Sequence, residues 1–496
     1  MSDDIEFMLN GEVMTVRDIR ADTTLLNWLR LTQQKTGSKE GCAEGDCGAC
    51  TILLRRPDDT SHSMQAVNGC ILFMPMIAGC VITTVEGISS KTGALHPVQQ
   101  AIIDHHGAQC GFCTPGFVVS LYWLWRQKGP FTSAAINDVL AGNLCRCTGY
   151  HPLVEAGKSL ADKDSPDWEV ARIKEEDEFL SQYAADKTLC LSHEGQRFFA
   201  PRTLEDFTAL YAEYPDAQIL SGGTDIGLWV TKQHREVPCI ISTKSMSELN
   251  KIEKQKANWV IGAGVSHQKA MDEMGADIPA LKEIWRRFGS MQVRASGTVC
   301  GNIANGSPIG DISPCFIALG AELRLTQKAA SRQIKLDDFF ISYGKQDREA
   351  GEFVEAVIIP YLEEDSYFHA HKISKRFDQD ISAVLIAAWL KLDGDKITSC
   401  RFAFGGMAGI PMRARHAENL VISQNPKDIS AQALREALAL DFTPLDDMRA
   451  SSSYRLTVAA NSLWRMLQSP KEEAPYSLAG EAVFQQMPTF QPEESR

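Results

Sequence analysis

Three cysteines stand within nine positions of the stretch GCAEGDCGACTI, residues 41–52. Cys42, Cys47 and Cys50 are spaced C-x4-C-x2-C, and Cys70 follows in AVNGCILF. Glycines at 41, 45 and 48 allow positive φ values and let the backbone come close to a bound group. Four thiolates on such a loop can converge on metal, and backbone amides directed at the sulfurs stabilise a negatively charged centre. The pattern therefore predicts a metal-binding loop.

The spacing distinguishes between kinds of metal site. C-x4-C-x2-C with a distant fourth cysteine is the plant-type spacing for a [2Fe–2S] cluster. Zinc, the alternative, is more often held by paired C-x2-C knuckles than by three cysteines in one loop. Packing of four such cysteines without metal is a weaker alternative still. The spacing favours a [2Fe–2S] cluster.

A second group of four cysteines follows in QCGFCTPG (Cys110, Cys113) and GNLCRCTGY (Cys145, Cys147). The C-x2-C pair is expected to open a helix near Pro115, and the C-x-C pair follows a helix predicted to end near residue 143. A helix N-terminus favours an anionic centre. Taken alone, this group could bind zinc, but a chain with one redox centre has use for a second.

Bulk composition excludes several classes of protein. The chain has 496 residues, 44% of them hydrophobic, and a net charge of −13, which disfavours nucleic-acid binding. The start, MSDDIEFMLNGE, lacks the features of a signal peptide. The longest uncharged stretch is broken by Pro75 and Gly79 and is too short to cross a membrane. We expect a cytoplasmic protein, in which clustered cysteines bind metal rather than form disulfides.

Two glycine-rich stretches lie in the middle of the chain. ILSGGTDIG, at 219–227, reads as a strand that runs into a glycine turn whose amides can cradle a phosphate. A Gly-Gly turn without further motif residues is more often a structural turn than a phosphate-binding one. The stretch 286–314, RRFGSMQVRASGTVCGNIANGSPIGDISP, is a stronger signal of a binding site. It is too polar to be part of the core and too long to be a turn without a function.

Apolar spacing predicts the elements that position these groups. IEFMLNGEVMTV alternates like a hairpin around Asn10-Gly11, and helices are predicted over TTLLNWLRLTQ, HPVQQAIIDHHG, PGFVVSLYWLWRQKG and TSAAINDVLAGN, the last capped by Thr132 or Ser133. Residues 158–190 are polar and charge-dense, which indicates a linker with at most one short helix. From about 195, TLEDFTALYAEYP (helix), AQILSGG and WVIGAGVS (strands) indicate an α/β or α+β domain. Later, ISAVLIAAWLKLDGDKITSCRFAFGG is predicted to form strands around Asp393-Gly394.

GCxEGDCGACT, QCGFCTPG and GNLCRCTGY resemble the signature of the molybdenum hydroxylases, the xanthine dehydrogenase family. The resemblance implies that Cys42, Cys47, Cys50 and Cys70 hold one [2Fe–2S] cluster and that Cys110, Cys113, Cys145 and Cys147 hold another. Six further cysteines belong to neither pattern, and five of them are expected to be buried small hydrophobic residues: Cys80, Cys190, Cys239, Cys315 and Cys400.

The same resemblance implies an α+β multidomain fold. Its expected parts are a β-grasp [2Fe–2S] ferredoxin domain at 1–86, a four-helix [2Fe–2S] domain at 87–160, a linker at 161–194, an α/β FAD-binding domain similar to vanillyl-alcohol-oxidase-type flavoproteins at 195–362, a C-terminal α+β flavoprotein domain at 363–468, and a tail at 469–496.

Flavin-binding residues are also implied by the resemblance. Leu220, Ser221, Gly222, Gly223, Thr224, Asp225 and Ile226 would wrap the FAD diphosphate, and Phe288 would lie beside the isoalloxazine ring. The diphosphate and ribitol would meet Thr298, Val299, Cys300, Gly301, Asn302 and Ser307, and the adenosine sugar would meet Asp311. Val354 and Lys372 complete the set. Cys300 stands where a second glycine is expected, which predicts a tighter loop. KRFDQDIS, at 375–382, matches the loop at the flavin edge, although Asp378 and Asp380 could equally be surface charges.

The resemblance implies an electron-transfer role. Relatives in this family oxidise substrate at a molybdopterin centre on a large domain, for which this chain has no room, so we expect that centre on a separate large subunit and no catalytic acid or base here. Fused iron–sulfur and FAD domains resemble the small subunit of bacterial xanthine dehydrogenase. Electrons would pass through both clusters to FAD and then to NAD⁺, in an α2β2 heterotetramer. The alternatives are the same role with another N-heterocycle or aldehyde, and a non-enzymatic redox-responsive protein.

Overall fold

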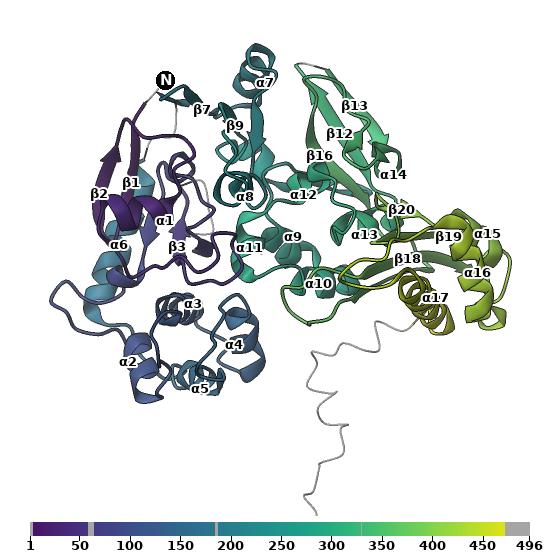
Figure 1. The fold of residues 1–496 in the computed structure, drawn as a ribbon, viewed down its shortest axis with the longest axis horizontal. Coiled ribbons are helices and arrows are strands. Elements are labelled where there is room, and N and C mark those ends of the chain that lie inside the picture. Colours follow the sequence, from purple (N-terminus) through teal and green to yellow (C-terminus); the bar gives the residue numbers. More distant parts are fainter. Residues whose placement is uncertain (1–2, 58–63, 184–186, 329, 472–496) are drawn as a thin grey trace, which may run out of the picture.

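The computed structural model of the chain describes residues 3–57, 64–183, 187–328 and 330–471. Figure 1 shows an N-terminal sheet with a group of helices beneath it, a central region, and a C-terminal region at the far end. Within the described residues, no helix has the length and apolar character needed to cross a bilayer.

The N-terminal sheet is mixed, with its strands in the order β2-β1-β5-β3-β4. Asn10 and Gly11 both have positive φ and turn β1 into β2, so the predicted hairpin is confirmed. The sheet carries α1 (Leu25–Asn27), which continues as a π-helical turn over Trp28–Thr32. Its strands are β1 (Ile5–Leu9), β2 (Glu12–Val16), β3 (Thr51–Arg55), β4 (Gln65–Asn68) and β5 (Val81–Thr83).

The helical region beneath this sheet contains the three helices predicted for it and one more. Thr132 caps its helix by accepting from the Ala135 amide, as predicted, and His96 forms a capping box with Gln99. Phe117, Tyr122 and Trp125 fill the centre of the group. The four helices are α2 (Pro97–Asp104), α3 (Thr114–Arg126), α4 (Ser133–Leu140) and α5 (His151–Lys158).

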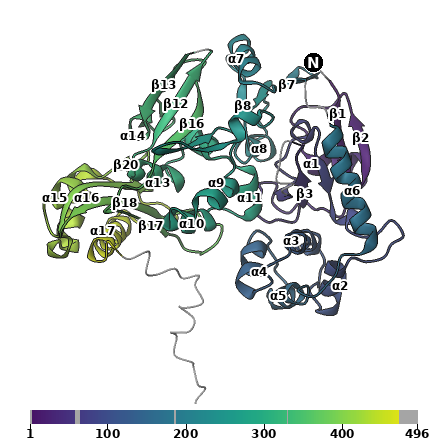
Figure 2. The same cartoon turned by 180° about the vertical axis from the view of Figure 1, so that it is seen from behind.

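The predicted linker differs from the expectation. Nearly half of it is a sixteen-residue helix, α6 (Asp167–Gln182), which runs along the N-terminal sheet and reaches the helical region (Figures 1 and 2). Three of its charged residues are buried, and two of them have distant partners: Glu176 pairs with Arg55 of β3 at 3.0 Å, and Glu169 with His96 at 3.0 Å. Charge density here therefore reflects buried ion pairs rather than a solvated connection.

Glu169 is the residue of α6 whose loss should cost most. Its carboxylate is fully buried and accepts from His96, Tyr122 and Arg172. Burial opposes its ionisation, but the hydrogen bonds from His96 and Tyr122 outweigh that effect, so its pKa is lowered. Its stabilisation is therefore present above the pKa of an unfolded glutamate and is lost as pH falls through the lowered value.

We expect Glu169→Ala to reduce the stability of the N-terminal half by about 3–5 kcal/mol, because it leaves Arg172 buried without this partner. Thermal unfolding followed by circular dichroism measures the effect. The control is Glu155→Ala, which removes an exposed glutamate paired with Lys158 and should leave the melting temperature unchanged. Equal melting temperatures for the two variants would contradict a stabilising role for the buried pair.

The central region contains two sheets. The first has the order β6-β7-β9-β8, with β8 and β7 each parallel to β9, and the second is antiparallel with the order β10-β11-β16-β12-β13. Their strands are β6 (Leu189–His193), β7 (Gln196–Ala200), β8 (Gln218–Leu220), β9 (Cys239–Ser242), β10 (Ile252–Lys254), β11 (Asn258–Gly262), β12 (Glu322–Gln327), β13 (Ala330–Lys335) and β16 (Phe353–Pro360), with a small hairpin of β14 (Phe340–Ser342) and β15 (Lys345–Gln346).

Helices of the central region fill the space between and beside these sheets. The predicted helix over TLEDFTALYAEYP is confirmed as α7. The first glycine-rich stretch forms the turn between β8 and α8, and the second contains the short helices α11 and α12 with the turns beside them. The helices are α7 (Leu204–Glu213), α8 (Ile226–Thr231), α9 (His267–Met274), α10 (Pro279–Arg286), α11 (Met291–Ser296), α12 (Val299–Asn305), α13 (Ile312–Leu319) and α14 (Leu336–Phe339).

The C-terminal region is a four-stranded antiparallel sheet, β17-β18-β19-β20. The predicted pair of strands around Asp393-Gly394 is confirmed as β18 and β19. One hydrophobic core continues from the central region into this sheet. Its elements are β17 (Ser366–Ile373), β18 (Val384–Asp393), β19 (Lys396–Gly405), β20 (Met412–Arg413), α15 (Arg415–Val421), α16 (Ala431–Asp441) and α17 (Ser452–Gln468). Of the predicted tail, residues 472–496 lie outside the described residues.

Candidate functional site

The first cysteine group is assembled by one loop and one pair of strands. Cys50 immediately precedes β3 and Cys70 follows β4, and because these strands pair, their ends meet. The Cys42 thiol lies within hydrogen-bonding reach of those of Cys47 and Cys70, and Cys70 is similarly close to Cys50. The four thiols that the sequence predicts as one group are thus brought together.

Backbone amides surround the Cys42 sulfur. The N–H groups of Glu44, Asp46 and Cys47 each donate to Cys42 Sγ at 3.4 Å. Gly45 and Gly48 take positive φ values of 80° and 69°, which bend the loop into this shape. Hydrogen bonds from the Cys47 and Cys70 thiols, and then from the amides, lower the pKa of Cys42. The loop is built to stabilise negative charge on sulfur, as an anionic iron–sulfur cluster requires.

The second cysteine group lies where α3 begins and the chain returns after α4. Cys113 is the N-cap residue of α3, so the predicted placement of the C-x2-C pair is confirmed. Cys113 lies beside the Cys145 thiol, and burial followed by that contact raises its pKa to about 12. Cys110 and Cys147 have their Sγ atoms 3.6 Å apart, close to the roughly 3.8 Å expected for two thiolates on one tetrahedral ion with metal–sulfur bonds of about 2.3 Å.

The two groups differ in burial and in pairing. Cys50 and Cys70 are buried, whereas Cys110 and Cys147 are exposed. Among the residues that the structure describes, no set of three or more metal-ligating side chains converges tightly enough for a single ion. A [2Fe–2S] cluster spreads four thiolates over two irons, two on each, and therefore needs pairs. The observed pairs fit that donor set.

The remaining cysteines divide into two kinds. Cys80, Cys315 and Cys400 are buried, as predicted. Cys190 and Cys239 are only partly buried, because they lie near the ends of strands β6 and β9, and the expectation of full burial was wrong for them.

The two cysteine groups are in direct contact. The amide of Leu144, which precedes Cys145, donates to the Cys47 carbonyl at 2.9 Å. A Cβ placed on Gly41 would lie 3.3 Å from the Phe112 ring, so the loop of the first group packs against that of the second. A single hydrogen bond therefore joins the backbones that carry one ligand candidate from each group.

The glycine-rich stretches meet each other in the central region. A Cβ on Gly222 would overlap the backbone of Ser296 and Gly297, and Gly223 has a positive φ of 77°. These glycines let the turn after β8 pack flat against the turn before α12. Burial raises the pKa of Asp225, which hydrogen bonds with Trp229 and Asn305 partly oppose.

We call the turns at residues 220–226 and 298–302 together the glycine cradle. Residues around α12 form its second half. Thr298 caps α12 by accepting from the Gly301 amide, and Asn302 leaves its Oδ1 buried with no hydrogen-bond partner. Cys300 does not line the loop, because its side chain is buried and its thiol donates to Ile261 O at 3.5 Å. The backbone turns and the absent side chains fit a diphosphate-bearing cofactor, and the orphaned Asn302 oxygen fits a hydrogen-bond donor such as a hydroxyl group of that cofactor.

The remaining predicted flavin residues lie in four places. Asp311 and Lys372 form a buried ion pair at 2.5 Å, and Ser382 donates to the second Asp311 oxygen at 2.5 Å. Phe288 packs on the ring of His267, with the centroids 4.5 Å apart; burial lowers the pKa of that histidine to about 3, so it is neutral. Val354 is part of the hydrophobic core instead. Ser307 accepts from the Ile309 amide within its own turn.

The loop at 375–382 bridges regions. Arg286 and Arg287 both contact the Phe377 ring, with guanidinium carbons 5.1 and 4.6 Å from its centroid. Gln379 donates to the Ala141 carbonyl of the helical region. Asp380 accepts from the Arg376 amide at 2.8 Å and so shapes the turn, whereas Asp378 is exposed.

The sequence did not reveal how the first cysteine group meets the glycine cradle. Lys232 Nζ donates to the Cys42 carbonyl at 2.7 Å, and Thr231 Oγ1 donates to the Ala43 carbonyl at 2.6 Å. A Cβ on Gly227 would lie 2.9 Å from Ile71, the residue after Cys70. Residues 231 and 232 end α8 and carry no motif, so only the folded chain identifies them.

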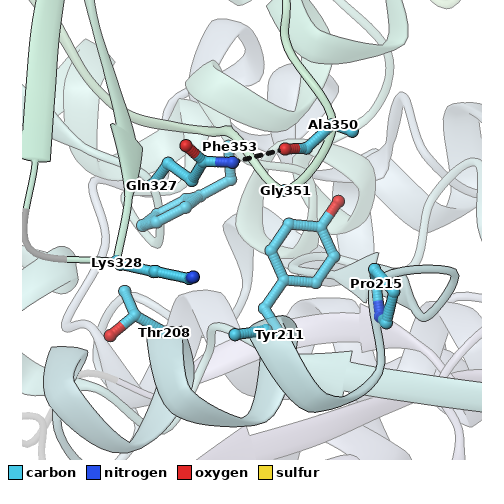
Figure 3. A pocket seen from close by; sticks show the side chains of 9 residues that line it. Thr208, Tyr211, Pro215, Gln327, Lys328, Ala350, Gly351 and Phe353 are labelled. Carbon is cyan, nitrogen blue, oxygen red and sulfur yellow. Dashed lines mark hydrogen bonds between the residues drawn. The ribbon is translucent and has the colours of Figure 1, made fainter.

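Two surface hollows lie apart from these groups. One of about 150 Å³ is formed between α7 and the turns beside β12 and β16, where Gln327 donates to the Ala350 carbonyl above Tyr211 (Figure 3). Another of about 410 Å³ lies beside Trp229 and Arg235. Neither contains a cysteine of the two groups or a residue of the Gly222 turn.

Three family models match successive parts of the chain. A [2Fe-2S] binding domain matches residues 84–158, the FAD binding domain in molybdopterin dehydrogenase matches 193–362, and the CO dehydrogenase flavoprotein C-terminal domain matches 369–469. These domains define an iron–sulfur flavoprotein. The chain belongs to the molybdenum hydroxylase family. It is the iron–sulfur and FAD electron-transfer component of such an enzyme.

Individual relatives agree with this assignment. Xanthine dehydrogenase 1 of Arabidopsis thaliana is 31% identical over 500 residues, covering 86% of this chain and 37% of the relative. Aldehyde oxidase 2 of Macaca fascicularis is 28% identical over 474 residues, covering 84% and 35%. The chain thus spans about a third of the length of the curated relatives it matches.

Solved structures share the fold of about half the chain. A chain of the Cu,Mo-CO dehydrogenase has a TM-score of 0.51 at 22% identity, covering 54% of this chain and 94% of that chain. A chain of quinoline 2-oxidoreductase from Pseudomonas putida 86 has a TM-score of 0.50 at 23% identity, with the same coverage. At this identity, the likeness concerns the fold alone.

Proposed function

We propose that the chain carries electrons from a molybdopterin-binding partner, through two [2Fe–2S] clusters, to FAD and on to NAD⁺, in an enzyme that oxidises xanthine or hypoxanthine. The observation that carries this proposal is the row of contacts from the exposed second cysteine group, through the first, to the glycine cradle. Transfer between redox centres weakens steeply with distance, so adjoining sites suit a relay.

Each proposed cluster has four thiolate ligands. The first would be held by Cys42, Cys47, Cys50 and Cys70, and the second by Cys110, Cys113, Cys145 and Cys147. In the first group, the amides that donate to Cys42 would favour the reduced state. The two groups differ in exposure and in amide donors, and these are properties that separate cluster potentials.

The glycine cradle is the proposed flavin site. Residues 220–226, Thr298, Gly301 and Asn302 would hold the diphosphate, and the buried Asp311–Lys372 pair would fix the polar side of the site. FAD, when bound, supplies the conversion between hydride transfer and the one-electron steps of the clusters. Phe288, on the neutral His267, offers an apolar face for the flavin ring.

Electrons would reach the chain at the second cysteine group. Cys110 and Cys147 are exposed, and two large apolar side chains stand exposed beside ligand candidates, Phe112 at 46% and Leu144 at 61%. Exposed apolar residues around a redox site suit a docked partner. We propose a large molybdopterin-binding subunit there, in a heterotetramer with two copies of each subunit. A cytoplasmic location suits the fourteen free thiols.

Several of the curated relatives that match this chain are named xanthine dehydrogenase, and these names favour xanthine as the substrate. Aldehyde oxidase 2 and quinoline 2-oxidoreductase among the similar proteins favour a second candidate, the same relay serving an aldehyde or another N-heterocycle. Isolation of the chain from its host with bound partners, followed by an assay of NAD⁺ reduction, separates these candidates. Xanthine-dependent formation of urate and NADH is expected.

Other outcomes of this assay have distinct meanings. A co-purifying molybdopterin subunit that reduces NAD⁺ with quinoline or an aldehyde, and not with xanthine, would replace the substrate and keep the relay. Reduction of an artificial dye by NADH with stoichiometric FAD would exclude a non-enzymatic protein. A chain that binds neither flavin nor iron would contradict the relay itself.

A further inference from the structure

A buried polar junction lies where three parts of the molecule meet. Gln292 of α11 is fully buried, and its Nε2 lies 3.4 Å from Thr51 Oγ1, 3.3 Å from Ser120 Oγ and 3.4 Å from Asn143 Oδ1. We call these four residues the Gln292 junction. One amide of the central region is thereby shared with the N-terminal sheet and with two segments of the helical region.

The partners of Gln292 are also bonded to one another. Asn143 Nδ2 donates to the Gly48 carbonyl at 3.1 Å and to Thr51 Oγ1 at 3.3 Å. Ser120 Oγ donates to Asn143 Oδ1 at 2.6 Å, and Thr51 Oγ1 donates to the Gly48 carbonyl at 2.6 Å. All four side chains of the junction are buried. Gln292 Oε1 is buried without a hydrogen-bond partner, so the junction is held through Nε2 and through the bonds among the other three residues. These buried bonds form together in a particular mutual placement of the parts and therefore favour that placement.

Three glycines bring the backbones together at the junction. A Cβ on Gly48 would overlap the Gly142 carbonyl, and one on Gly116 would overlap the Gly48 carbonyl. A Cβ on Gly142 would overlap Gln292 Oε1 and lie 2.8 Å from Ser290 Cβ. The backbones at Gly48, Gly116 and Gly142 therefore lie against one another, and side chains of Ser290 and Gln292 lie against Gly142, which leaves these segments little room to shift.

The junction lies beside the ligand candidates of both cysteine groups. Thr51 follows Cys50, and Asn143 stands two residues before Cys145. The same short helix also reaches the glycine cradle, because the backbone of Ser296 at its other end packs on Gly222. Figures 1 and 2 show α11 where the central region meets β3 and α3. The helix α11 thus touches all three proposed cofactor sites.

We propose that Gln292 is a positioning residue, which holds the two cysteine loops and the glycine cradle in fixed relative positions for electron transfer. This inference rests on the proposed relay. Without the amide, the three buried acceptors lose their common donor, and the two cysteine loops gain freedom to move relative to each other and to α11. Because transfer depends steeply on distance, such a shift slows electron passage without removing any ligand.

The test is Gln292→Leu in the full chain loaded with its cofactors. We expect iron and flavin contents equal to those of the wild type, an altered magnetic interaction between the two reduced clusters in electron paramagnetic resonance, and flavin-to-cluster electron transfer at least tenfold slower. Hydrogen exchange of segments 41–51 and 142–147 in the chain without cofactors should rise. Ser120→Ala, which removes one acceptor, should move these readouts in the same direction and by less.

Gln196→Leu is the matched control. Gln196 is likewise a buried glutamine of the central region, and it donates to Asp22 of the N-terminal domain at 2.5 Å instead of to a cysteine loop. It should leave the cluster interaction and the transfer rate unchanged. Unchanged readouts in both Gln292→Leu and Ser120→Ala, with cofactors bound, would overturn the positioning role and leave the relay standing. A wild-type chain that binds no clusters would overturn the relay itself.

Discussion

Cys70→Ser is expected to remove one of two [2Fe–2S] clusters and to leave the other in place. Cys70 is 2% exposed and lies between the Cys42 and Cys50 thiols, so its sulfur is central to the first group. A serine hydroxyl is a harder donor than a thiolate and is protonated at neutral pH, which makes it a poor ligand for an iron–sulfur cluster. Iron and acid-labile sulfide should fall to about half of the wild-type values.

The control for this variant is Cys80→Ser. Cys80 belongs to the same domain and is 1% exposed, but it stands outside both cysteine groups. It should retain all of the iron. Cys110→Ser should remove the second cluster and spare the first. In electron paramagnetic resonance, the two variants should therefore each lose a different one of the two cluster signals. Full iron in Cys70→Ser would contradict the proposed ligand set, and equal losses in Cys70→Ser and Cys80→Ser would indicate a general folding defect.

Gly222→Ala is expected to weaken FAD binding while iron is retained. The added Cβ would overlap the Ser296 carbonyl, and since that neighbour is backbone, one of the two turns of the cradle must move. Overpacking of this kind costs about 1–3 kcal/mol, which corresponds to roughly 5- to 150-fold weaker binding. Flavin fluorescence during titration of the deflavinated chain measures the dissociation constant.

Gly409→Ala is the matched control for Gly222→Ala. A Cβ on Gly409 would meet only Tyr343 Cβ, at the ordinary contact distance of 3.8 Å. Its FAD affinity should equal that of the wild type. If Gly222→Ala binds FAD as tightly as this control does, the turn after β8 is not part of the flavin site.

Features fixed by local chemistry could be predicted from the sequence. Asn10-Gly11 and Asp393-Gly394 marked two hairpins because their glycines readily take the positive φ values, 83° and 59°, that such turns require. Thr132 marked a helix start because its side chain satisfies a free amide. The cysteine spacings likewise predicted two thiol groups, each of which the fold brings together from two separate segments.

Features that depend on distant partners could not be predicted. The charge-dense stretch at 158–190 gave no sign that Glu169 and Glu176 of α6 pair with residues 73 and 121 positions away. Gln292 stands in a polar stretch whose role became visible only beside Thr51 and Asn143. Such contacts are set by tertiary packing, which overrides local composition.

A reductive titration tests the central claim, that this chain is an iron–sulfur and flavin relay. The purified chain, loaded with cofactors and kept without oxygen, would be titrated with NADH while flavin and cluster absorbance are followed. The account predicts uptake of about four electrons per chain, two by FAD and one by each cluster, with both cluster signals appearing in electron paramagnetic resonance. Uptake that ends at about two electrons, with no cluster signal, would contradict it.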